Sequence, residues 1–202
     1  MFLEWIIKSL KPNGVANVVL PDGIFTNVGN KRLHDFIITN CYIEGILSLP
    51  INTFFNTPKK TYIMTLRKKR DVSKKQNYPV FAYYCTSIGE TLDVYRFDSD
   101  DNDFQTAVNK YNLFRSCKDK NQIEEYLKPI FEDDLKLKLF SIDSFQPHSA
   151  WDIEKRWTDE EKVKMGVKKA DVIMNLDEFS EYLTEIVDDI NNYGEAIKCL
   201  NS

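Results

Sequence analysis

The residues most able to do binding chemistry lie in one short stretch, NTFFNTPKK, at residues 52–60. Phe54 and Phe55 offer two aromatic rings, and Lys59 and Lys60 add two positive charges shortly afterwards. Aromatic rings can stack on planar ligands, and ammonium groups can neutralise phosphates. Loops usually carry polar residues, so the residues alone leave a second interpretation open, in which both rings are buried and anchor a long loop.

Positive charge continues beyond this stretch. Residues 59–75 hold a single acid, Asp71, against eight basic residues: Lys59, Lys60, Arg67, Lys68, Lys69, Arg70, Lys74 and Lys75. Residues 176–202 have the opposite balance, with seven acids and one cation, Lys198. The formal net charge of −4 argues against a protein that coats nucleic acid over its whole surface, so any such contact is expected to be local.

Other recognisable catalytic patterns are missing from the sequence. There is no P-loop, no G-x-G-x-x-G, no G-x-S-x-G and no H-E-x-x-H. The four cysteines are scattered and there are only two histidines, so no metal site is predicted. The acid pairs at 133–134 and 188–189 are most simply solvated, and His34 is interpreted as structural. The chain therefore lacks a recognisable, self-contained active site.

The elements expected to position the loop follow from hydrophobic periodicity. Helices are predicted at 1–10 and 30–40, and strands at 14–20, 42–50 and 61–68. Strand, helix and strand in this order indicate a βαβ unit. The connection from Pro50 to Lys60 is long for a hairpin. Ligands sit beyond the carboxyl ends of the strands in such sheets, so this loop is placed where function is common.

The second half of the chain is predicted to be less regular. Strands are indicated at 78–86 and 135–140, and the acids of 98–103 precede a helix whose dipole they favour. Capping boxes are indicated by Asn121 with Glu124, Thr158 with Glu161, and Asn175 with Glu178. The last of these opens an acidic amphipathic helix. No apolar run approaches the roughly 18 residues of a membrane helix, so no membrane contact is expected and the cytoplasm is the default location.

Two longer stretches, LKPNGVANVVLPDGIF and LSLPINTFFNTPKKTYIMTLRK, resemble a known family. They are similar to the second half of the catalytic domain of amino-methylating DNA methyltransferases, specifically the modification subunit of type I restriction-modification systems. The family patterns are L-K-x-G-G, L-P-D-G, L-P and F-x-x-T-x-x-K-T, in that order. Their counterparts here are Leu10, Lys11, Asn13 and Gly14; Leu20, Pro21, Asp22 and Gly23; Leu49 and Pro50; and Phe55, Thr57 or Pro58, Lys60 and Thr61. Asn13 replaces the first glycine of the family pair. The resemblance is close over residues 1–69 and loose from 78 to about 115.

The resemblance implies an α/β fold with a partial Rossmann-like, S-adenosylmethionine-dependent methyltransferase sheet. Residues 1–70 would form the C-terminal half of the methyltransferase core, with its last three strands and the final strand antiparallel. Residues 71–78 would be a linker or exposed turn. Residues 79–202 would form a mixed α+β, mainly helical C-terminal region that ends in the acidic amphipathic helix.

Intact members of that family bind S-adenosylmethionine at a glycine-containing loop and hold the flipped adenine at an Asn-Pro-Pro-aromatic motif. Neither motif occurs here, and the sequence has no Pro-Pro dipeptide. The chain is therefore expected to be a fragment that neither binds the cofactor tightly nor methylates DNA alone. No catalytic, cofactor-binding or metal-binding residue is assigned to it.

The resemblance also gives the aromatic loop a function. Phe55 is expected to pack against the extruded base, with Phe54 packing under the loop. The residues expected to contact DNA phosphates are Lys59, Lys60, Arg67, Lys68, Lys69 and Arg70. Pro21, Asp22 and Gly23 are expected at the rim of the pocket. A merely solvated loop remains an alternative for the lysines, and turn formation alone explains Asp22.

The partners implied by the resemblance are DNA, the DNA-specificity subunit and the restriction subunit, with a complementary N-terminal methyltransferase half as a further possibility. The competing hypothesis is a non-catalytic interaction module that binds such a half or the specificity subunit. A third hypothesis is half of a small-molecule or protein methyltransferase. An open strand edge would favour dimerisation or aggregation of the isolated chain.

Overall fold

The computed structural model describes residues 2–55, 57–117 and 123–169, and in the C-terminal part residues 179–181, 183–184, 186–187 and 190. The chain forms two compact units, residues 1–168 and residues 169–202. The predicted linker at 71–78 lies inside the first unit. The capping pairs predicted at 121–124 and 175–178 fall on or reach into segments outside the described residues.

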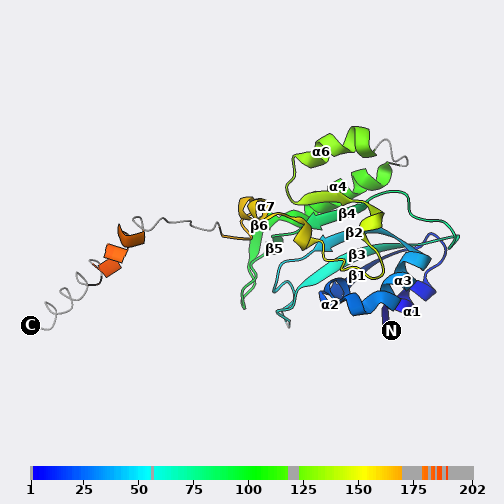
Figure 1. Cartoon of the computed structure of the whole chain (residues 1–202), viewed down its shortest axis with the longest axis horizontal. Coiled ribbons are helices and arrows are strands. Elements are labelled where there is room, and N and C mark those ends of the chain that lie inside the picture. Colours follow the sequence, from blue (N-terminus) through cyan, green and yellow to red (C-terminus); the bar gives the residue numbers. More distant parts are fainter. Residues whose placement is uncertain are drawn as a thin grey trace, which may run out of the picture. The chain divides into compact units, whose positions relative to one another are not determined.

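A five-stranded sheet organises the first unit (Figure 1). Its strands, in spatial order, are β1 (Val15–Pro21), β3 (Thr61–Lys68), β2 (Cys41–Ser48), β4 (Val80–Tyr84) and β7 (Leu137–Phe140). β3 is antiparallel to both β1 and β2, so β1 and β2 run in the same direction on either side of it. β4 is parallel to β2, and β7 is antiparallel to β4. The predicted mixed α/β architecture is confirmed, and the sheet continues on both sides of residues 71–78.

One face of the sheet is covered by N-terminal helices and by a segment from much later in the chain. The helices are α1 (Phe2–Ser9), α2 (Gly23–Thr26), η1 (Val28–Asn30) and α3 (Lys31–Asn40), and the later segment contains η3 (Ile142–Ser144) and η4 (Glu154–Arg156). Trp151 and Trp157 of that segment are fully buried in the same core as Phe25 and Ile37. Hydrophobic periodicity predicted α1 and α3, but it gave no sign that residues 145–157 would complete this core.

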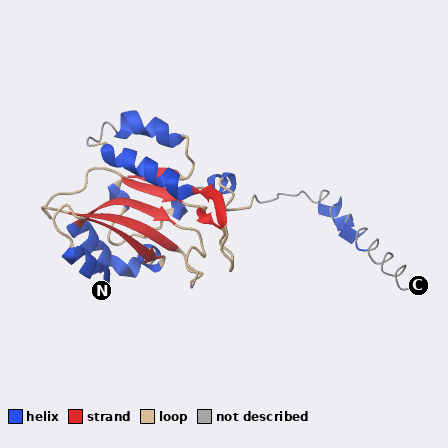
Figure 2. Ribbon diagram, turned by 180° about the vertical axis from the view of Figure 1, so that it is seen from behind, coloured by secondary structure: helices blue, strands red, loops and turns tan. Residues whose placement is uncertain are grey.

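The opposite face of β4 and β7 is covered by α4 (Asp103–Ser116), a π-helical turn η2 (Ile123–Leu127) and α6 (Lys128–Glu132) (Figure 2). Phe81, Phe114, Phe131 and Leu137 are among the buried residues of this second core. Asn102 begins α4 by accepting a hydrogen bond from the Phe104 amide at 2.9 Å.

The acidic run before α4 differs from expectation. It forms a strand, β6 (Asp98–Asn102), paired antiparallel with β5 (Ile88–Glu90). Backbone pairing within this hairpin therefore overrides the low strand propensity of aspartate. The predicted capping box is confirmed at the start of α7 (Asp159–Lys164), where the Thr158 hydroxyl accepts from the Glu161 amide at 3.2 Å.

In the second unit, residues 179–181, 183–184, 186–187 and 190 are helical and expose Phe179, Leu183, Ile186, Val187 and Ile190. These belong to the apolar stripe predicted for the last helix. Among the described residues, no helix is both long and apolar enough to cross a membrane.

Candidate nucleic-acid interface

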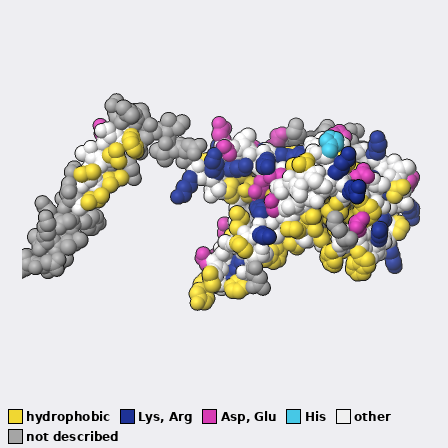
Figure 3. All heavy atoms as spheres, turned by 60° about the horizontal axis from the view of Figure 1, so that its bottom comes forward, with side chains coloured by type: hydrophobic (Ala, Val, Ile, Leu, Met, Phe, Trp, Pro, Cys, Tyr) yellow, Lys and Arg dark blue, Asp and Glu magenta, His cyan; other side chains and the backbone are white. Residues whose placement is uncertain are grey.

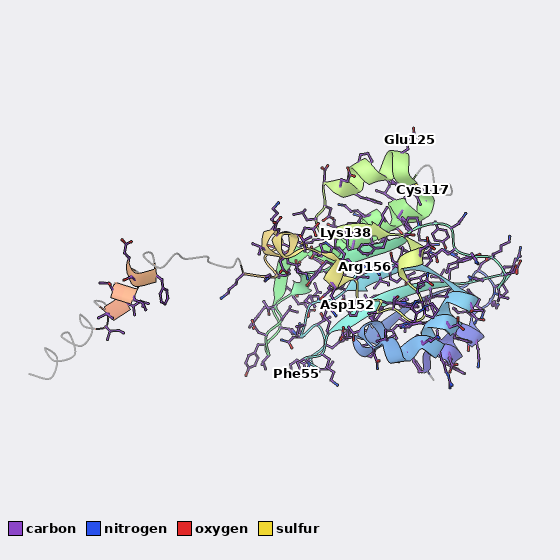
Figure 4. The ribbon with its side chains drawn as sticks, in the orientation of Figure 1. Phe55, Cys117, Glu125, Lys138, Asp152 and Arg156 are labelled. Atoms are coloured by element: carbon purple, nitrogen blue, oxygen red, sulfur yellow. The ribbon has the colours of Figure 1, made fainter. Side chains whose placement is uncertain are left out.

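The loop between β2 and β3 presents both phenylalanines to solvent. Phe54 and Thr57 form a single antiparallel bridge, in which the Thr57 amide donates to the Phe54 carbonyl at 3.1 Å. Phe55 lies at the turn of this bridge and is 70% exposed, and Phe54 is 40% exposed. Figure 4 places Phe55 at the outer end of the loop. Both rings are therefore exposed and are not buried anchors of the loop, and the packing of Phe54 under the loop stays a prediction.

The rim residues lie beside the base of this loop. Pro21 ends β1, and the Asp22 amide donates to the Lys60 carbonyl at 3.0 Å, so the returning loop is bonded to the end of β1. The Asp22 carboxylate accepts from the Thr26 hydroxyl at 3.2 Å at the start of α2. The structure thus brings together the rim and the loop, with the Asp22 side chain already bonded inside its own turn.

Two carboxylates that sequence reasoning missed complete this end of the sheet. Asp152 lies 3.4 Å from the Tyr62 hydroxyl and accepts from the Glu154 amide at 3.0 Å. Glu154 accepts a hydrogen bond from Ser48 and forms an ion pair with Lys60. Burial, followed by the nearby charge of Glu154, raises the pKa of Tyr62. Nothing in the local sequence around 152–154 indicates this contact, because it depends on how a distant segment packs.

The two lysines of the loop have different environments. Lys60 turns inward, where its ammonium pairs with Glu154 and lies 5.7 Å from the centre of the Tyr62 ring and 5.4 Å from that of Tyr84. Lys59 is exposed. Within the described part of the chain, no carboxylate forms an ion pair with Lys59. Of these two lysines, both predicted to contact phosphates, only Lys59 has no ion-pair partner among the described residues.

The other basic residues predicted to contact DNA lie at the far end of β3. Arg67 and Lys68 are the last residues of the strand, followed by Lys69 and Arg70. At about 3.3 Å per residue, Lys68 lies roughly 25 Å from Lys60 along the strand. The structure therefore does not bring these four residues together with the aromatic loop.

Two of the four also have internal partners. The Arg67 guanidinium forms an ion pair with buried Glu44, with an Nη2–Oε2 distance of 3.1 Å, and this hydrogen bonding raises the pKa of Arg67. Lys69 is buried, and its ammonium donates to the Ile38 carbonyl at 2.6 Å. Burial lowers the pKa of Lys69. These contacts hold the end of the sheet together.

A further residue that sequence reasoning missed, Arg96, ties the loop to the β5–β6 hairpin. Its guanidinium donates to the carbonyls of Asn52 and Thr53 in the loop and, at 3.0 Å, to that of Thr91 in the hairpin. The loop that carries Phe55 is thus held from outside as well as by its own bridge.

The rim and the loop lie outside the cavity that the structure shows beside β7. A cavity of about 910 Å³ runs along β7, and its lining includes none of the rim or loop residues. The carboxylates at the rim are already bonded to Thr26, Tyr62, Ser48 and Lys60. Within the described ranges, no group of three or more His, Cys, Asp and Glu side chains is arranged to hold a metal ion.

A family model described as N-6 DNA Methylase matches residues 1–154. No curated protein matches the chain. One similar solved structure comes from work on complex assembly and conformational transition of the type I R-M system; it is 15% identical, has a TM-score of 0.48, and the alignment covers 98% of this chain and 38% of that one.

Two further solved structures are similar. The methyltransferase subunit of the type I restriction-modification system from Streptococcus thermophilus is 21% identical, with a TM-score of 0.43 and coverage of 72% of this chain and 25% of that one. The M protein of the type I restriction enzyme EcoKI is 14% identical, with a TM-score of 0.40 and coverage of 87% of this chain and 45% of that one. The chain thus spans less than half the length of each of these three structures.

Proposed function

The chain belongs to the N-6 DNA methylase family, and from this premise we propose that it supplies the base-side loop of an adenine-specific DNA methyltransferase of the type I restriction-modification kind. In the intact protein, S-adenosylmethionine would donate the methyl group to the exocyclic amine of an extruded adenine. The role of this chain is to hold the extruded adenine and the DNA backbone beside it. The isolated chain is proposed to be inactive, because its sequence lacks the family's glycine-containing cofactor loop and its Asn-Pro-Pro-aromatic motif.

The observation that carries the proposal is the exposed Phe55 ring at the end of the sheet where β1 and β2 finish. A base that leaves the duplex loses its stacking partners, and an aromatic face restores about 1–3 kcal/mol without reading sequence. Phe54 lies beside it and widens the apolar surface. Lys59 supplies the free charge for a phosphate, whereas Lys60 positions the loop through Glu154.

The sheet topology supports the placement of this loop. An antiparallel strand between two strands of common direction is the arrangement expected for the last three strands of the family's sheet, with β1, β2 and β3 in the places of strands five, six and seven. The basic residues from Arg67 to Arg70 stay outside the proposed interface, because they follow the opposite end of β3.

The test is Phe55→Ala in a reconstituted full-length methyltransferase, with Phe2→Ala as a control that removes an exposed ring elsewhere. We expect DNA methylation to fall about tenfold in the Phe55 variant, matching the loss of a stacking contact, and to be unchanged in the control. Fluorescence of 2-aminopurine at the target position measures the same contact directly, since a stacked base is quenched. Unchanged methylation and quenching would remove the stacking role.

The non-catalytic alternative, a module that binds a complementary methyltransferase half, is favoured by one observation. β1 stands at the edge of the sheet order, with no strand beyond it among the described residues. Such an edge can pair with another chain. Co-purification with an N-terminal methyltransferase half, followed by a methylation assay of the complex, separates the two: a stable but inactive complex supports the module.

A further inference from the structure

The tip of the β5–β6 hairpin, residues 91–97, presents large apolar side chains to solvent. Tyr95 is 77% exposed and Phe97 is 67% exposed, and Val94 beside them is exposed as well. Hydrophobic side chains gather over the end of the projection that this hairpin and the neighbouring loop form (Figure 3). Single exposed apolar residues are common, whereas a cluster that includes aromatic rings marks an interaction site.

The hairpin tip is closed by hydrogen bonds to Thr91. The Thr91 amide donates to the Phe97 carbonyl at 2.9 Å, and the Phe97 amide donates to the Thr91 hydroxyl oxygen at 3.1 Å. The same hydroxyl donates to the Tyr95 carbonyl at 3.2 Å. The backbone that carries both rings is therefore ordered before any partner arrives, which lowers the entropic cost of binding through them.

Arg96 fixes the direction in which the tip faces. It lies between Tyr95 and Phe97 and is only half-buried, with its guanidinium turned inward to the carbonyls of Asn52, Thr53 and Thr91. Because Arg96 anchors the hairpin to the loop, the two flanking rings are held on the outside. The Tyr95 and Phe97 rings are therefore held in place before a partner binds.

The charge around these rings is strongly negative. The hairpin carries five carboxylates, at Glu90, Asp93, Asp98, Asp100 and Asp101. None of the five forms an ion pair with another described residue. Its single cation is Arg96, which is bonded to the loop. A surface with this charge repels DNA phosphates and attracts cations.

We propose that residues 90–101 form a docking surface for a polypeptide segment that carries basic and apolar side chains. Tyr95 and Phe97 are its anchors, and the carboxylates around them form a polar rim that steers the partner. Aromatic anchors surrounded by complementary charge are the usual anatomy of a protein interface. The surface lies beside the loop of Phe55 but does not depend on base stacking by that residue.

The experiment measures binding of a fluorescent amphipathic peptide, with leucines on one face and lysines on the other, to the full 202-residue chain. The test variant is Tyr95→Ala with Phe97→Ala. The matched control is Phe2→Ala with Trp5→Ala, which removes two rings of α1 that are 73% and 66% exposed. We expect fluorescence anisotropy to show affinity weakened by about tenfold or more in the test variant, and unchanged in the control. A second peptide, with glutamates in place of the lysines, is expected not to bind.

Several results would overturn the proposal. These are absence of peptide binding, equal losses in both double variants, and equal binding of the glutamate peptide. Duplex DNA binding that requires Tyr95 and Phe97 would assign the surface to nucleic acid. Self-association in sedimentation that disappears only in the test variant would assign it to a second copy. Phe55→Ala is expected to leave peptide binding unchanged, so failure of the base-stacking role and failure of this surface are distinguishable.

Discussion

At the start of β3, Phe55 and Lys59 are exposed and Lys60 is turned inward, whereas at the end of the strand Arg67 and Lys69 both have partners inside the protein. In the sequence these positions form one basic run. In the structure the run is divided by the strand between them, and Lys60, Arg67 and Lys69 each bond to a group inside the protein. Basic residues that are close together in the sequence therefore do not necessarily form one exposed basic surface. The two ends differ in their carboxylates: Glu154 pairs with Lys60 at the start of β3, and Glu44 pairs with Arg67 at its end.

The largest effect is expected at the far end of β3, where Glu44 accepts from both Arg67 and the Tyr111 hydroxyl. Glu44→Gln keeps the shape but leaves the guanidinium without a counter-charge. Loss of one partner of a buried pair lowers the free energy of unfolding by about 3–5 kcal/mol, and because Arg67 is partly exposed we expect a decrease of about 2 kcal/mol here. Urea unfolding measures this free energy. Glu90→Gln, an exposed acid on β5, is the control, and equal stability of the two variants would mean that the far end is not held by this pair.

At the other end of β3, near the loop that carries Phe55, folding stability is expected to depend on pH through a histidine. His34 is buried, its ring lies 3.8 Å from that of Trp151, and its Nε2 lies 2.7 Å from the Ile24 carbonyl. Burial lowers the pKa of His34, only partly offset by the carbonyls of Ile24 and Pro147. The unfolded chain therefore binds the proton more readily. Stability is full above the ordinary value of 6.5 and is lost as pH falls below it toward the folded pKa.

This pH effect is measured as the change in urea midpoint between about pH 7.5 and about pH 5.5, the range in which histidine titrates. The wild-type chain is expected to lose more stability on acidification than His34→Gln does. His148, the other histidine, is exposed, and His148→Gln is expected to behave like the wild type. An identical loss in all three proteins would show that the segment packed on the loop end is not sensitive to His34.

Sequence reasoning reached the parts of the molecule that local patterns determine. The apolar spacing in residues 1–10 and 30–40 predicted α1 and α3, the β-branched runs predicted β1, β2 and β3, and Thr158 with Glu161 predicted a helix start. Each of these signals lies within a few residues of the element it describes.

The contacts that decide the candidate site could not be predicted in that way. Glu154 reaches Ser48 across 106 residues of sequence, and Arg67 reaches Glu44 across 23. Both depend on tertiary packing. The residue types at Phe54 and Phe55 left both buried and exposed rings open and on their own favoured buried ones, whereas the structure places Phe55 at the turn of the bridge between Phe54 and Thr57, with its ring exposed.

The smallest effect compares single lysines at the two ends of β3. Lys59→Ala removes the free charge beside Phe55, and Lys68→Ala removes the same charge at the other end of the strand. If DNA approaches the loop, the first substitution lowers the slope of log affinity against log salt concentration by about 1, and the second leaves it unchanged. Anisotropy titrations of a duplex oligonucleotide at several salt concentrations measure both slopes. Equal reductions would mean that DNA contacts both ends of β3. The two groups of basic residues would then still be separated in the structure, but they would not differ in DNA binding.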